Sequence, residues 1–86
     1  MTANRKLADI MMKLVRKRGP DKTICPSEVA RKYATDDWRR YMKSVRRTAE
    51  ALHEAGLIQI EQGGEVVEPE KYSGPIRLRI APEARK

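Results

Sequence analysis

Over the first part of the chain, apolar residues recur with the period of an α-helix. Residues 3–18 carry one apolar stripe, which predicts an amphipathic helix that a Gly-Pro pair ends. A second, shorter helix is predicted over residues 27–34, with Ser27 as its N-cap. A long third helix is predicted to begin at Trp38 and to stop at Gly56. Its apolar stripe consists of Trp38, Met42, Val45, Ala49 and Leu52.

After the third helix the period changes to the alternation that is typical of β-strands. Residues 57–62 alternate between apolar and polar side chains, residues 63–64 are two glycines that predict a turn, and residues 66–67 extend a second hairpin arm. Residues 75–80 alternate again, and residues 23–25 form a short β-type segment. In the last strand Ile76, Leu78 and Ile80 share one face, and Arg77 and Arg79 share the other.

The order of these elements predicts the fold. Helix, short strand, helix, helix, strand, long turn and strand is the order of a winged helix, in which residues 23–25 supply the third strand. We therefore predict an α+β winged helix with three helices and a small antiparallel sheet or wing. It forms one domain over residues 1–86, with residues 82–86 as a polar tail. The alternative is another small α+β topology that shares this order.

Composition excludes several classes of protein. With 86 residues, of which 40% are hydrophobic, the chain can form one small domain with a thin core. Its apolar runs fall well short of the roughly 20 residues of a membrane span, and no secretory leader is recognisable. One cysteine excludes an internal disulfide framework and a cysteine-rich zinc site. We expect a cytoplasmic protein.

The whole chain has a net charge of +7, and its basic residues are concentrated in the first two thirds. Residues 1–53 hold 14 basic and six acidic side chains, whereas residues 54–86 hold five and six. Such a distribution favours an anionic partner. Five cations of the third helix lie on the side opposite its apolar stripe, at about 80–200° from Trp38. They are Arg39, Arg40, Lys43, Arg46 and Arg47.

These five cations predict a DNA-binding surface. In a helix-turn-helix the second helix enters the major groove, where cations meet phosphates and base edges. We therefore expect a small DNA-binding protein, such as a transcriptional regulator. The alternative is an ordinary solvated helix face.

The predicted hairpin is acidic, which favours a second hypothesis. It carries four glutamates, and Lys71 is the one lysine among them. A hairpin that grips a phosphate backbone would be basic, so the same scaffold could instead be a non-catalytic protein-interaction module that uses the acidic wing or an edge strand. Arg77 and Arg79 could also pair with the glutamates across the hairpin. These glutamates are Glu61, Glu65, Glu68 and Glu70.

No set of residues predicts catalysis. Cys25 lies between Ile24 and Pro26, which predicts a buried, inert thiol. His53 is the one histidine and lies near the end of the third helix without companions for metal binding or base catalysis. Trp38 is expected to close the core. We expect no enzyme activity, no cofactor and no metal, and the sequence identifies no dimerisation helix.

Several segments together resemble a family of small bacterial proteins classified as a domain of unknown function (DUF). The resemblance covers about residues 5–80 and implies a winged-helix-like fold, but no reaction and no cofactor. DNA binding would follow from it only by analogy of fold. The matching positions are residues 23–31, Trp38, Arg39, Met42, Val45, Arg46, Ala49, Leu52, Gly56, Ile58, Gln62, Gly64 and residues 74–79.

Overall fold

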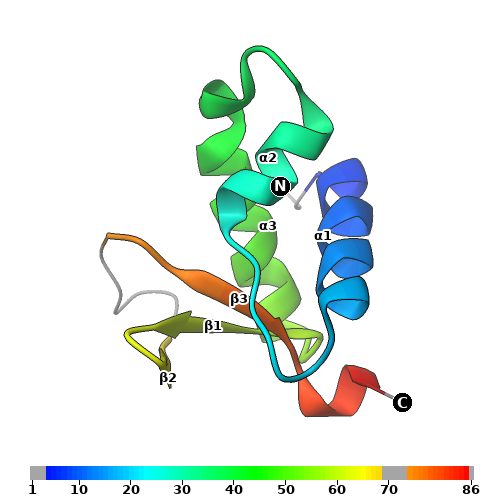
Figure 1. Ribbon diagram of the computed structural model, residues 1–86, viewed down its shortest axis with the longest axis vertical. Helices are drawn as coiled ribbons and strands as arrows, with labels where there is room; N and C mark the ends of the chain where they lie inside the picture. Colours follow the sequence, from blue (N-terminus) through cyan, green and yellow to red (C-terminus); the bar gives the residue numbers. More distant parts are fainter. Residues whose placement is uncertain (1–3, 69–73, 86) are drawn as a thin grey trace.

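Three helices pack against a small antiparallel sheet in the computed structural model, which describes residues 4–68 and 74–85 (Figure 1). The α-helices are α1 (Arg5–Arg18), α2 (Pro26–Tyr33) and α3 (Met42–Glu54). The strands are β1 (Ile58–Gln62), β2 (Glu65–Val66) and β3 (Arg77–Ile80). Two short 3-10 helices are η1 (Trp38–Tyr41) and η2 (Pro82–Arg85). None of the helices in the described part of the chain is long and apolar enough to cross a membrane.

The central strand of the sheet is β1, and the strand order is β2-β1-β3. Both neighbours are antiparallel to β1; Ile60 lies opposite Leu78, and Glu61 lies opposite Val66. The predicted glycine turn is present between β1 and β2, with φ values of 63° and 86° that other residues rarely adopt. The alternation of the last strand is confirmed, since its three apolar side chains are buried.

Residues 23–25 do not form the predicted third strand. Ile24 pairs only with Leu78, through two backbone hydrogen bonds of 2.8 and 2.9 Å, and β2 is the third strand instead. Two features stop the pairing from spreading. The backbone N–H of Lys22 donates to the carbonyl oxygen of Gly19 at 3.3 Å instead of to β3, and Pro26 has no N–H to donate.

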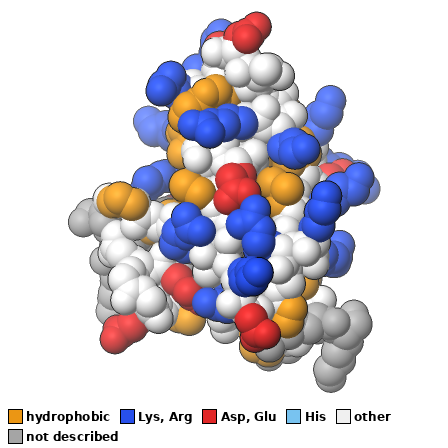
Figure 2. Space-filling model, viewed as in Figure 1, with side chains coloured by type: hydrophobic (Ala, Val, Ile, Leu, Met, Phe, Trp, Pro, Cys, Tyr) orange, Lys and Arg blue, Asp and Glu red, His pale blue; other side chains and the backbone are white. Residues whose placement is uncertain are grey.

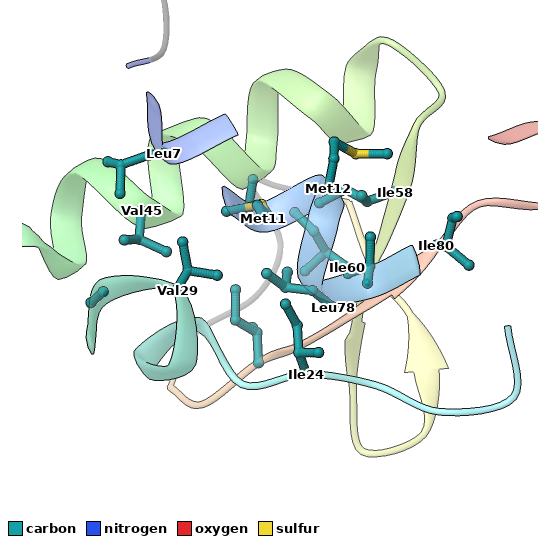
Figure 3. Close-up of a cluster of buried hydrophobic side chains, with 14 residues drawn as sticks. Leu7, Met11, Met12, Ile24, Val29, Val45, Ile58, Ile60, Leu78 and Ile80 are labelled. Atoms are coloured by element: carbon teal, nitrogen blue, oxygen red, sulfur yellow. The ribbon is translucent and has the colours of Figure 1, made fainter. Parts of the chain in front are cut away.

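The hydrophobic core lies between the three helices and the sheet (Figure 3). Val45 and Ala49 of α3 are fully buried, and the other three members of the predicted α3 stripe pack against this core, so the stripe is confirmed. The fully buried side chains from the other elements include Leu7, Met11, Ile24, Val29, Ile58, Ile60 and Leu78.

The third helix does not begin at Trp38 as predicted, because residues 38–41 form the 3-10 turn η1. Trp38 packs against the core, and the ring of Tyr41 meets the ring of Tyr33 edge-on at 4.9 Å. A 3-10 helix has three residues per turn, so residues three apart lie above one another. The turn thus directs Trp38 and Tyr41 to the same side, toward α2.

Helix α2 begins one residue earlier than predicted, with Cys25 rather than Ser27 as its N-cap. The Glu28 carboxylate accepts a hydrogen bond of 2.9 Å from the backbone N–H of Cys25. Ser27 lies inside the first turn, where its hydroxyl donates to Cys25 Sγ at 3.2 Å. Pro26 fits the first helical position because it has no N–H to leave unsatisfied.

The architecture is therefore α+β, with three helices and a three-stranded antiparallel sheet, and it is compatible with a winged helix. Of the predicted polar tail, residues 82–85 form η2, and Ala84 packs against the core.

Candidate nucleic-acid interface

Two of the five predicted cations point outward from α3. Lys43 and Arg47 are exposed and lie one turn apart, on the side opposite the buried Val45 and Ala49. Like charges four residues apart destabilise a helix by about 0.2–0.5 kcal/mol. Because Lys43 and Arg47 are exposed, this face of α3 can present both charges to an anionic partner.

Arg46 joins α3 to the end of the hairpin. Its guanidinium donates a hydrogen bond of 3.2 Å to the carbonyl oxygen of Gly74, which adopts a φ of 83°. Arg46 is half-buried, in contrast to Lys43 and Arg47. The sequence predicts it as one of five equivalent cations, but in the structure it holds the hairpin end beside the N-terminal half of α3.

Arg39 and Arg40 belong to η1 and do not follow the helical wheel of α3. The guanidinium of Arg39 lies 4.6 Å from the ring centroid of Trp38, and that of Arg31 from α2 lies 4.5 Å from the same ring. Arg40 lies over Tyr41 at 5.6 Å and forms an exposed ion pair of 3.4 Å with Asp37. Such cation–π contacts are worth about 0.5–1 kcal/mol at exposed sites and leave the guanidinium edges accessible.

A hollow of about 360 Å³ lies between the start of α2, α3 and the hairpin end. Cys25 contributes to its wall and is half-buried, so the prediction of a buried thiol is wrong. Helix α2 begins at Pro26 and leads the chain away from the sheet. The Cys25 side chain, directly before this helix, therefore lies at the rim of the hollow. The lining residues are Cys25, Pro26, Met42, Arg46, Gly74, Pro75 and Ile76.

The hairpin presents less negative charge than the sequence predicts. Glu61 is buried and accepts a hydrogen bond of 2.6 Å from Arg79, which confirms the cross-hairpin pairing for that arginine. The contact with Glu61 raises the pKa of Arg79 above its usual value. Glu65 and Glu68 remain exposed, whereas residues 70–71 lie outside the described part of the chain.

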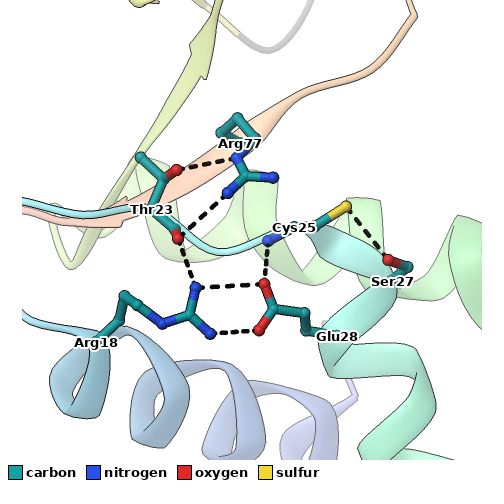
Figure 4. A network of polar contacts seen from close by, with 6 residues as sticks. All are labelled: Arg18, Thr23, Cys25, Ser27, Glu28 and Arg77. Carbon is teal, nitrogen blue, oxygen red and sulfur yellow. Dashed lines mark hydrogen bonds and ion pairs between the residues drawn. The ribbon is translucent and has the colours of Figure 1, made fainter.

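A polar network ties the end of α1 to the start of α2 (Figure 4). Arg18 forms an ion pair of 2.5 Å with Glu28 and donates to the Thr23 carbonyl oxygen at 2.8 Å. Burial acts to raise the pKa of Glu28, but the hydrogen bonds from Arg18 and from the Cys25 N–H outweigh it and lower that pKa. Sequence analysis missed Arg18, although an arginine in the last turn of a helix is a recognised signal for contacts at that end.

Replacing Glu28 by glutamine is expected to lower the free energy of unfolding by about 1 kcal/mol at pH 7, since both ion-pair side chains are about a third exposed. Because folding lowers the pKa of Glu28, its contribution is complete above the usual value of 4.5 and is lost as the pH falls through the folded value. Urea unfolding at pH 7, 5 and 3 should therefore show the two proteins converging in acid. An unchanged difference at pH 3 would contradict this account, and Glu65→Gln on the exposed hairpin is the control.

His53 is in the last turn of α3, as predicted, with its side chain 15% exposed and its Nε2 3.8 Å from the carboxylate of Glu68. Within residues 4–68 and 74–85, no three histidine, cysteine, aspartate or glutamate side chains form a group that could hold a metal ion.

Comparisons with known proteins give a family but no activity. Among curated proteins no match is found for this chain. A family model described as a protein of unknown function (DUF3253) matches residues 4–81, which is most of the chain. The chain therefore belongs to the DUF3253 family.

Proposed function

We propose that this protein is a cytoplasmic, non-enzymatic DNA-binding protein of the winged-helix type, of the kind that serves in transcriptional regulation. The observation that carries the proposal is the outward pair of Lys43 and Arg47 on α3, the second helix of the α2–α3 pair. The hydrogen bond from Arg46 to Gly74 keeps the hairpin end beside that helix.

Docking follows from the shape of the helix pair. In helix-turn-helix proteins the second helix lies in the major groove while other parts contact the backbone. Lys43 and Arg47 then meet phosphates or guanine edges, and Arg39 and Arg40 extend the cationic surface at the leading turn. Arg46 would add a further cation to this surface, at the side of α3 that faces Gly74. Phosphates would also relieve the repulsion between Lys43 and Arg47.

The distribution of charge supports an anionic partner. Figure 2 shows lysine and arginine side chains spread over one face of the molecule, with acidic side chains scattered between them. Because Glu61 is largely buried and is paired with Arg79, it adds little to the negative surface of the hairpin. The hairpin should therefore repel DNA less than its four glutamates alone would suggest.

The Lys43→Gln/Arg47→Gln double variant is expected to bind duplex DNA more weakly in a sequence-independent way. Each lost phosphate contact removes about 0.9 from the slope of log K against log[salt], so the slope should become shallower by about 2. At 0.1 M salt this corresponds to a loss of roughly 50-fold in affinity. Fluorescence anisotropy with a mixed-sequence duplex at several salt concentrations measures both quantities.

The matched control is Lys13→Gln/Lys17→Gln, which removes two exposed charges from α1 instead. It should change the affinity by no more than about threefold, because charges remote from the interface act only through screened long-range attraction. Equal losses in the two double variants, or no duplex binding at 50 mM salt, would contradict the proposal.

A second candidate function is a protein-interaction module. The observation that favours it is Val66, an exposed apolar residue that is 50% accessible on the short edge strand β2. Edge strands offer unpaired backbone groups to a partner strand. The duplex titration separates the candidates, because a protein-interaction module would not bind DNA at low salt.

A further inference from the structure

A second hollow, which is basic, lies away from the outer face of α3. It has a volume of about 380 Å³ and is formed by the end of α1, the connection that follows it and β3. Its walls are made almost entirely by polar and charged side chains, in contrast to the largely apolar hollow beside Met42. The lining residues are Arg18, Asp21, Lys22, Thr23, Arg77 and Arg79.

Thr23 organises the donors of this hollow (Figure 4). Its carbonyl oxygen accepts hydrogen bonds from Arg18 at 2.8 Å and from Arg77 at 3.4 Å. Its hydroxyl oxygen accepts another from Arg77 Nε at 2.9 Å, so the hydroxyl hydrogen is available for donation. Donors held in place by the protein lose little conformational entropy when they bind a ligand.

The charges of the hollow leave one positive charge without compensation. Arg18 is paired with Glu28, and Arg79 is paired with Glu61. Within the described residues neither Lys22 nor Arg77 forms an ion pair, and Asp21 is the acidic side chain in the wall. Two cations and one carboxylate give a local charge of +1, which matches one phosphodiester group.

The hollow lies next to the one beside α3 along two segments of the chain. Thr23 and Arg77 border it, while Cys25 and Ile76, one or two residues away, border the hollow beside α3. The two segments are joined by the Ile24–Leu78 pair. Gly74, which Arg46 contacts, precedes Arg77 by three residues, and a chain of that length spans at most about 10 Å. Measured along the axis of B-DNA, about 10 Å corresponds to roughly three base pairs.

We propose that the hollow around Thr23 and Arg77 binds one backbone phosphodiester of the duplex that lies on α3. This inference rests on the proposed function and adds to it a second contact, formed by elements outside the α2–α3 pair. The ligand group is a monoanionic phosphate. Arg77 and Lys22 supply the charge, and the Thr23 hydroxyl supplies a neutral donor.

Arg77→Gln tests the contact, with duplex affinity measured by anisotropy across salt concentrations. The slope of log K against log[salt] should become shallower by about 0.9, and the affinity at 0.1 M salt should fall roughly eightfold. Arg77→Lys keeps the charge and should retain the wild-type slope. The side chain of Lys22 is exposed and forms no hydrogen bond within the described residues. Lys22→Gln should therefore act in the same direction as Arg77→Gln without a change in thermal unfolding.

The controls separate this inference from the proposed function. Lys13→Gln removes one exposed charge from α1 and should change the affinity by no more than about twofold. If Arg77→Gln and Lys22→Gln behave like Lys13→Gln while Lys43→Gln/Arg47→Gln loses affinity, the second contact is wrong and DNA binding by α3 stands. If the wild-type protein does not bind duplex DNA at 50 mM salt, both the second contact and DNA binding by α3 are wrong.

A titration with inorganic phosphate at constant ionic strength distinguishes a free anion from the DNA backbone. Amide chemical shifts of Thr23 and Arg77 report on the hollow. Movement of these shifts by free phosphate, together with an unchanged duplex affinity in Arg77→Gln, would assign the hollow to a small anion and overturn the proposed backbone contact.

Discussion

Replacing Arg79 by methionine is expected to lower the free energy of unfolding by about 3 kcal/mol. Its partner Glu61 has a side chain that is only 10% exposed, and the two lie 2.6 Å apart. Removing the guanidinium leaves a carboxylate that is nearly buried and has lost its counter-charge, which is among the costliest single changes in a small domain. Urea unfolding at pH 7 measures the loss.

A double-mutant cycle shows whether the charge is the cause. Glu61→Gln/Arg79→Met has no unpaired carboxylate, so it should lie within about 1 kcal/mol of Glu61→Gln alone. Arg77→Met removes the other arginine of the same strand, which is exposed and contacts Thr23, and should cost less than about 1 kcal/mol. Equal losses for Arg79→Met and Arg77→Met would rule out this explanation.

Leu78→Ala is expected to cost about 2–5 kcal/mol, because the side chain is fully buried and its removal leaves a cavity. The total stability of a domain of this length is between about 4 and 13 kcal/mol. Leu78 lies opposite Ile60 in β1, and its backbone also pairs with Ile24. The substitution therefore weakens the packing between strands β1 and β3 and the residues around Ile24 that lead into α2.

Thermal and urea unfolding, followed by far-UV circular dichroism, measure this loss. Val66→Ala is the matched control, because Val66 is half-exposed and should lose less than about 0.5 kcal/mol. A Leu78→Ala protein as stable as Val66→Ala would contradict the assignment of Leu78 to the centre of the core.

Helices and strands that bury one face and expose the other could be predicted from sequence, because such burial places apolar residues at the regular spacing of that element. Helix α1 and strand β3 begin and end within two residues of their predicted bounds. The stretch around Trp38 could not be predicted, because a 3-10 turn and an α-helix both place residues three apart on similar sides. Contacts of Trp38 and Tyr41 with α2 favour the 3-10 turn, and the residues near Trp38 in the sequence do not reveal these contacts.

The candidate site was predictable in composition but not in arrangement. The sequence shows that five cations lie opposite an apolar stripe, but the contact that each one makes depends on the turn at η1 and on residues elsewhere in the chain. Arg46 contacts Gly74, 28 residues away, and Arg39 lies over a tryptophan. The hollow around Thr23 gives no sequence signal, since its donors come from three separate elements.

The contact between Thr23 and Arg77 has a consequence for the order of folding. It joins residues that are 54 positions apart, whereas the helices depend mainly on local contacts. Closing so long a loop carries an entropic cost that is regained only after the intervening elements have packed. The hollow should therefore form late in folding and be absent from partly folded chains. An anion bound there would stabilise the native state selectively, and slow its unfolding, because earlier states offer it no site.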